Sequence, residues 1–209
     1  MKEVAEFYQD ARRQWGEAIH DQWPAIARAY RGRAYHNLEH LGEMITHLTA
    51  LPVLPAPASS PTFAMALIYH DYVYRPTRGD NEAKSADVCV EHLSGTDASL
   101  TQLERCRQLI MATKTHRPSA SDDGGEALLI DLDLAVLARP AEKYRQYVKA
   151  IRKEFWMYPG VLYRPGRIKV LRHFLDQEHI YKTAYGREHY EARARKNLTA
   201  ELRQLGGQP

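Results

Sequence analysis

Cysteine is scarce in this chain of 209 residues, which contains Cys89 and Cys106 and no other. Both lie within patterns typical of helices. Two isolated cysteines of this kind do not resemble a disulfide framework or a cysteine-rich zinc site. We expect both to be small apolar side chains buried in a core.

The chain also has little excess charge of either sign. Its formal net charge of +3 is too small to require a nucleic-acid partner, although it is compatible with an anionic ligand. Glu188 and Glu191 interrupt a basic run near the C-terminus that consists of Arg187, Arg193, Arg195 and Lys196. This mixture is typical of a solvated helix face. We therefore predict no nucleic-acid partner.

Long apolar runs are missing as well. No window approaches about 18 consecutive apolar residues, so we predict no membrane-spanning helix and no membrane partner. Residues 1–6 lack the apolar stretch of a signal peptide, and a cytoplasmic location is therefore expected. An apolar content of 44% and a charged content of 26% are those of an ordinary globular protein.

The sequence has no alternating strand pattern and no internal repeat, and its apolar residues recur at helical spacing. Helices are predicted over residues 2 to about 22, 38 to about 50, 62 to about 71 and 81 to about 94. Asn37 can cap the second of these. The first is amphipathic and suits either the core or the surface of a homodimer. The predicted fold is all-α.

The length and the even composition favour one domain over residues 1–209. We expect its core at about 30–140, with C-terminal helices at about 140–206 packed on it. Leu198, Leu202 and Leu205 mark the apolar stripe of the last helix.

Two ionisable residues, the dipeptide His70-Asp71, closely follow residues 63–68, which are apolar on every side. Burying an ionisable pair costs several kcal/mol unless something compensates it. A metal ion is one compensation that uses both an imidazole and a carboxylate. The dipeptide therefore predicts part of a metal site.

Other segments offer the remaining ligands. His36 and His40 are four residues apart and share a face if their segment is helical. Asp131 and Asp133 lie in an apolar segment, where two helical residues two apart point about 200° from each other. One of the two carboxylates can therefore face a small ion, and spacing alone does not choose between them. The set suits one divalent ion, such as Mn, Fe, Ni, Co, Zn or Mg.

The spacing of His40, His70-Asp71 and Asp131 resembles the H…HD…D signature of the HD superfamily of metal-dependent phosphohydrolases. Residues 35–40, which read YHNLEH, are also similar to the YHNxxH motif of cyclic-nucleotide phosphodiesterases, distant members of that superfamily. More closely, nearly the whole chain resembles a bacterial family of predicted HD-type phosphohydrolases. The shared strings lie at residues 69–71, 79–82, 85–86, 112–113 with 116, 131–135, 151–155, 166–167, 170–171 and 174–175.

The resemblance implies an all-α, HD-type helical bundle with the metal between core helices. It implies that His40, His70, Asp71 and Asp131 bind the ion, and that His36 donates a proton to the leaving oxygen. The extra histidine pair of binuclear HD enzymes has no convincing counterpart, although His116 could contribute to one. The glutamine region of the cyclic-nucleotide enzymes has no counterpart either, so that substrate is not implied.

The expected activity is hydrolysis of a small phosphate ester, such as a nucleotide, with Asp71 or Glu82 orienting the attacking water. The ordinary alternative for Glu82 is a favourable acid near a helix N-terminus. Candidates for contact with the substrate, each of which could instead be an ordinary surface residue, are Arg75, Lys114, His116, Asp133, Arg152 and Arg167. Two rival functions are a non-catalytic sensor that binds a metal or nucleotide and a di-iron oxygenase of the HD type.

Overall fold

The computed structural model describes residues 2–15, 20–94 and 96–207. Within these ranges the chain forms eleven α-helices and two short 3₁₀ helices, and it contains no strand. The prediction of an all-α fold is confirmed. The chain groups into two compact units, Met1–Leu132 and Asp133–Pro209. The expectation of one HD-type domain stays a prediction.

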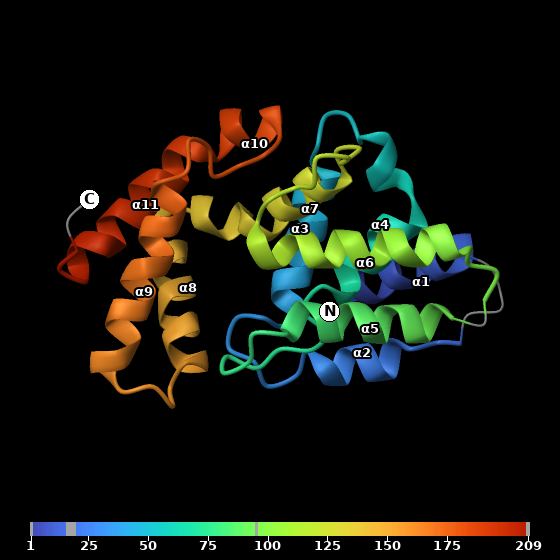
Figure 1. Ribbon diagram of the computed structural model, residues 1–209, viewed down its shortest axis with the longest axis horizontal. Coiled ribbons are helices and arrows are strands. Elements are labelled where there is room, and N and C mark those ends of the chain that lie inside the picture. The colour runs from blue at the N-terminus through green and yellow to red at the C-terminus, as the bar shows by residue number, and fades with distance from the viewer. Residues whose placement is uncertain (1, 16–19, 95, 208–209) are drawn as a thin grey trace. The chain divides into compact units, whose positions relative to one another are not determined.

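The first unit contains seven α-helices and one 3₁₀ helix among its described residues, and Figure 1 labels all of the α-helices. Their bounds are α1 Lys2–Trp15, α2 Trp23–Ala29, α3 Leu38–Thr49, η1 Ala56–Ser59, α4 Pro61–Tyr69, α5 Asn81–Leu93, α6 Leu100–Thr115 and α7 Gly125–Leu134. The boundary between the units falls within the last turn of α7. Asp133 and Leu134 simply continue this helix of the first unit.

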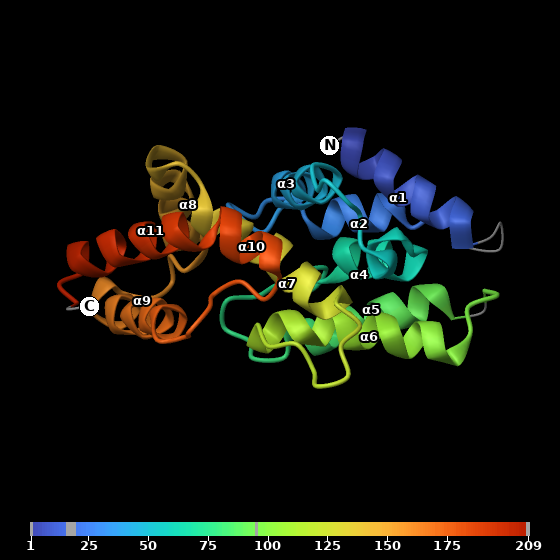
Figure 2. The same ribbon diagram turned by 90° about the horizontal axis from the view of Figure 1, so that it is seen from above.

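The centre of the first unit is α4, which is apolar all round and buried from Thr62 to Tyr69. A helix without a polar face must be enclosed by other elements. Helices α1, α3, α5 and α6 all contact it. Helices α5 and α6 lie side by side in both Figure 1 and Figure 2, and they bury the free thiols of Cys89 and Cys106 as expected.

The start of α3 agrees with the sequence pattern. The Asn37 side chain accepts hydrogen bonds from the backbone N–H groups of Glu39 and His40, at 2.8 and 3.3 Å, and so caps α3 as predicted. Helix α1 is described as far as Trp15, and residues 16–19 of its predicted range lie outside the described residues. Residues 20–22, also predicted as part of this helix, are not helical, so that end of the prediction is wrong. The apolar face of α1 is buried and packs on α3 and α4, which makes it part of the core.

The second unit consists of η2 Ala135–Ala138, α8 Ala141–Glu154, α9 Gly160–Leu175, α10 Ala184–His189 and α11 Glu191–Gln204. Helix α11 contacts η2, α9 and α10, and it buries Leu198 and Leu202 of the predicted stripe. Among the described residues of the whole chain, no helix combines the length and the apolar character that crossing a membrane requires.

Candidate metal centre

His70 occupies the C-terminal cap of the buried helix α4, and its side chain is 1% exposed. Its Nδ1 atom lies 2.9 Å from the carbonyl oxygen of Leu67. Because a carbonyl oxygen can only accept, Nδ1 carries the proton of this hydrogen bond. The other ring nitrogen, Nε2, lies 3.1 Å from Oδ2 of Asp71. On a neutral ring Nε2 is an acceptor, so two acceptors face each other, an arrangement that a cation or a second ring proton stabilises.

Four side chains bring possible ligand atoms together at this point. They are His40 from α3, His70 and Asp71 from the end of α4, and Asp133 from α7, and their ligand atoms all lie within 4.8 Å of one another. Metal bonds to imidazole nitrogen and carboxylate oxygen are about 2.0–2.2 Å, so two ligands on opposite sides of an ion are roughly 4.4 Å apart. The spacing and the donor set therefore fit one divalent ion.

The hydroxyl group of Tyr35 contacts the His40 ring on its Nδ1 side. The His40 ring is buried, and its Nδ1 atom lies 3.0 Å from the hydroxyl oxygen of Tyr35. The ring centroids of His40 and His70 are 5.5 Å apart with the planes at 69°. A hydrogen bond to the second nitrogen of a ligand imidazole fixes its orientation and tautomer. Tyr35 is therefore positioned to direct Nε2 of His40 towards the group.

The carboxylate from α7 in this group is Asp133, whereas the resemblance implied Asp131. Asp131 is buried at 2% exposure but does not belong to the group. The two residues project from opposite sides of the helix, as their separation of about 200° requires. As the spacing predicted, only one of the two carboxylates belongs to the group. Asp133, which spacing left open as a ligand and which was also a candidate for contact with the substrate, is the one placed beside the histidines.

His36 lies next to the group without belonging to it. Its ring stacks on Tyr74 with centroids 3.9 Å apart and planes at 26°. Its centroid is 6.1 Å from that of His40, and its edge packs on Tyr35. The ring is half-buried. This position, beside a ligand but outside the ligand set, suits a group that exchanges a proton with a bound substrate.

Arg33 is a residue of this region that sequence reasoning missed. Its guanidinium donates to three backbone carbonyl oxygens, those of His36 at 3.3 Å, Asp71 at 2.5 Å and Tyr72 at 2.7 Å. The partners are main-chain atoms, which every residue has, so the pattern of side chains in the sequence does not reveal them. The only available signal was the position of Arg33 three residues before His36.

The segment after Asp71 is held by the first turns of α5. The Asn81 side chain makes two hydrogen bonds with the backbone of Arg75, and the Ser85 hydroxyl accepts from the N–H of Val73. Asn81 and Ser85 are buried and act structurally. Glu82 is half-buried in the same turn and is not a member of the metal group.

The remaining substrate candidates differ in their surroundings. Arg75 and Lys114 have exposed side chains, while His116 caps α6 in the left-handed conformation with a φ of 51° and is not in the metal group. Arg152 donates to the carbonyl oxygens of Phe155 and Tyr158, at 2.7 and 3.0 Å. Its guanidinium therefore stabilises the turn after α8.

Arg167 lies inside the second unit. Its guanidinium forms a two-pronged ion pair with Glu201, with Nε–Oε1 and Nη2–Oε2 distances of 2.7 and 2.9 Å, and both side chains are less than a tenth exposed. Its centre also lies 5.6 Å from the ring of Tyr147. Because its donors are engaged in a buried pair, Arg167 acts as part of the core, and the expected contact with substrate finds no support in this geometry.

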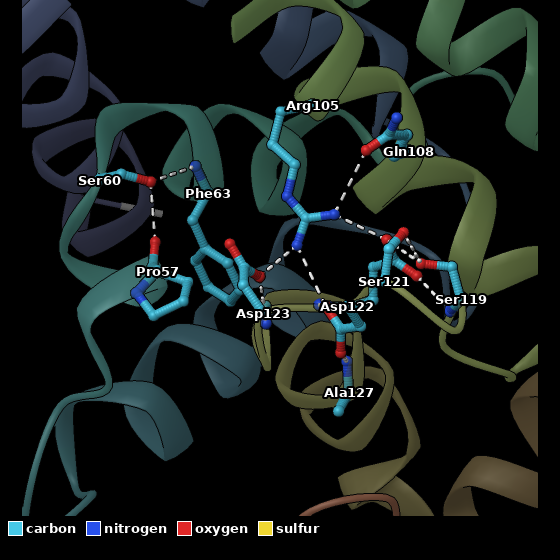
Figure 3. A network of polar contacts seen from close by, with 12 residues as sticks. Pro57, Ser60, Phe63, Arg105, Gln108, Ser119, Ser121, Asp122, Asp123 and Ala127 are labelled. Carbon is cyan, nitrogen blue, oxygen red and sulfur yellow. Dashed lines mark hydrogen bonds and ion pairs between the residues drawn. The ribbon is translucent and has the colours of Figure 1, made fainter. Parts of the chain in front are cut away.

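The start of α7, the helix that carries Asp133, is tied to α6 by a polar network (Figure 3). Arg105 pairs with Asp122 at 3.1 Å, with Glu126 at 2.6 Å and with Asp123. Asp122 also accepts from the backbone N–H groups of residues 126 and 127. This network anchors the N-terminal end of the helix that carries Asp133.

Comparison with models of known protein families gives no match for this chain, and comparison with curated proteins gives none either. The interpretation of the site therefore depends on its geometry. The resemblance to the HD superfamily stays a proposal, while the presence of a histidine and aspartate group with the spacing of metal ligands is a property of the structure.

Proposed function

We propose that this protein is a metal-dependent phosphohydrolase of the HD type that hydrolyses a small phosphate ester, such as a nucleotide. The observation that carries the proposal is the convergence of His40, His70, Asp71 and Asp133 within 4.8 Å of one another, with His36 beside them. Two imidazoles and two carboxylates fit Mn, Fe, Ni, Co or Zn, and Mg less well. Such an ion polarises a phosphoryl oxygen and makes a bound water a better nucleophile.

The side chains have separate tasks in this proposal. The Asp71 carboxylate, which is 14% exposed, can accept a hydrogen bond from the attacking water and so orient it. His36 donates a proton to the leaving oxygen, so that an alcohol departs in place of an alkoxide. Stacking on Tyr74 supports this role because it restricts the imidazole to one plane. Glu82, which lies outside the ligand set, helps to orient the water.

The two rivals differ in measurable ways. A di-iron oxygenase needs ligands for a second iron, whereas one group of this kind is found among the described residues. Two irons per chain would favour the oxygenase. A non-catalytic sensor would bind a nucleotide and metal without turnover. A homodimer also remains a proposal, and the buried apolar face of α1 is not its surface.

Phosphatase activity on a panel of small phosphate esters and nucleotides, with Mn, Co, Ni and Mg, tests the proposal. We expect metal-dependent hydrolysis that His70→Ala abolishes, with release of phosphate from a monoester or of an alcohol and a phosphate monoester from a diester. His92→Ala is a matched control, because His92 is also partly buried in the first unit and bonded to the Tyr69 hydroxyl at 2.8 Å but is not in the group. Equal activity of wild type and His70→Ala, or no turnover with any metal, would overturn the assignment.

A further inference from the structure

We infer that Arg33 is a positioning residue of the proposed metal centre, which holds the backbone of Asp71 and the backbone of His36 at a fixed spacing. The inference rests on the proposed function and extends it to a residue outside the ligand set. Arg33 lies in the turn between α2 and α3, and its side chain is half-buried.

The hydrogen bonds of Arg33 connect two segments that are distant in sequence. Nη1 donates to the carbonyl oxygens of Asp71 and His36, and Nη2 donates to that of Tyr72. Asp71 is 38 positions from Arg33 along the chain, whereas His36 is three positions away. One guanidinium thus joins the residue that supplies a carboxylate ligand to the residue that is proposed to supply the proton.

Ring contacts support the same geometry. The centre of the guanidinium lies 5.0 Å from the ring of Tyr30 and 5.7 Å from the ring of Tyr74. Tyr74 is the ring on which His36 stacks, and the Tyr30 hydroxyl donates to the carbonyl oxygen of Ile68 at 2.7 Å. Arg33 therefore contacts one aromatic residue that orients His36 and another that anchors the end of α4 just before His70.

The chemistry of this contact calls for arginine. A guanidinium presents five N–H donors in a rigid plane, so it can serve three carbonyl oxygens and pack its faces on aromatic rings at the same time. A lysine ammonium has three donors on a flexible stem and cannot reproduce the fork. Arg33→Lys keeps the charge and loses the geometry, which separates positioning from a simple effect of charge.

The expected consequence is a weaker metal site in a folded protein. Residues that orient metal ligands from behind typically change affinity by about 10–100-fold when they are removed. We expect Arg33→Ala to raise the dissociation constant for Co²⁺ by roughly this factor, and Arg33→Lys to recover only part of the loss.

Arg195 provides a matched control. Its guanidinium also donates to three backbone carbonyl oxygens, those of Leu175 at 3.0 Å, Gln177 at 2.6 Å and Glu178 at 2.8 Å. It lies on α11, far in sequence from all four residues of the metal group, and pairs with Glu191. Arg195→Ala and Arg195→Lys therefore remove a similar set of structural hydrogen bonds without touching the backbone of a proposed ligand.

The experiment is equilibrium dialysis of the full-length protein against Co²⁺ for wild type and the four variants, at a temperature where circular dichroism shows each to be folded. Weaker binding in both Arg33 variants and wild-type binding in both Arg195 variants would support the inference. Wild-type binding in the Arg33 variants, or equal losses in the Arg195 variants, would overturn it and leave the proposed metal site standing. Absence of Co²⁺ binding by the wild type would overturn both. Arg33→Lys keeps the test decisive if Arg33→Ala does not fold.

Discussion

Nε2 of His70 lies 3.1 Å from Oδ2 of Asp71, while Nδ1 of the same ring donates to the carbonyl oxygen of Leu67. At the end of α4, one ring nitrogen of His70 is therefore hydrogen-bonded to the backbone, and the other faces a carboxylate. A neutral imidazole and an ionised carboxylate in this arrangement present two acceptors to each other, which favours binding of a cation or of a second ring proton.

Replacing Asp71 with Asn makes this relationship testable. An amide N–H can donate to Nε2 of His70, so a hydrogen bond replaces the contact between two acceptors. We expect Asp71→Asn to bind Mn²⁺ at least about 10-fold more weakly, while the metal-free protein unfolds at the wild-type temperature or above it. Thermal unfolding in chelator and in excess Mn²⁺ measures both effects. An unchanged stabilisation by Mn²⁺ in the variant would contradict the assignment of Asp71 as a ligand.

We expect substitutions of the two carboxylates of α7 to affect different properties, metal affinity for one and stability for the other. Asp133→Asn should weaken metal binding by about 10-fold or more, because it removes a charged ligand. Asp131 is buried outside the metal group, so Asp131→Asn should change the free energy of unfolding more than it changes the metal affinity. Isothermal titration with Mn²⁺ and urea unfolding separate the two. Loss of metal binding in Asp131→Asn alone would restore the assignment that the resemblance implied.

The buried pair of Arg167 and Glu201 predicts an effect on stability. Glu201→Ala leaves the Arg167 guanidinium buried without its partner, which typically costs about 3–5 kcal/mol of unfolding free energy. Activity per folded molecule should stay at the wild-type level if Arg167 is a core residue. Replacement of both residues by Met should restore much of the stability. A loss of substrate affinity in the double variant, with stability intact, would instead make Arg167 a substrate contact.

Asp122 predicts a dependence of stability on pH. Burial would raise the pKa of Asp122, but hydrogen bonds from the backbone of Ala127 and Glu126 and from Arg105 outweigh it and lower the pKa. Because the folded-state pKa is below the unfolded value of about 3.9, the stabilisation is complete above that value. It is lost as the pH falls through the folded-state pKa.

Urea unfolding of metal-free wild type and Asp122→Asn over a range of pH measures this contribution. The difference in unfolding free energy between the two proteins should be largest near neutral pH and should shrink in acid. A difference that does not change with pH would mean that the Asp122 carboxylate gains no stabilisation from its ionised form.

Much of the first unit follows from local patterns in the sequence. The cap at Asn37 and the all-apolar run of α4 are visible as residues, because each acts within its own helix. The position of His70-Asp71 at the end of a buried helix likewise predicts a polar pair in need of compensation. Three members of the metal group, His40, His70 and Asp71, are therefore predictable from sequence patterns.

The features that the sequence did not predict depend on the rotation of a helix and on hydrogen bonds to main-chain atoms. Asp131 and Asp133 are equally good candidates until the rotation of α7 is known, and that rotation is a matter of tertiary packing, which buries residues 128–130 and 132 of the helix. Arg33 binds backbone carbonyls from a segment 38 residues away, which no side-chain pattern reveals. Arg167 looked available for phosphate because its partner Glu201 is 34 residues away.

The metal content of the protein tests the central claim most directly. We expect elemental analysis after dialysis against Mn²⁺ or Co²⁺ to find about one divalent ion per chain in the wild type, as one four-ligand group predicts. His70→Ala should retain almost none, and the control His92→Ala should retain the wild-type amount. Wild-type protein without bound ion, or a His70→Ala variant that retains as much ion as the wild type, would contradict the account.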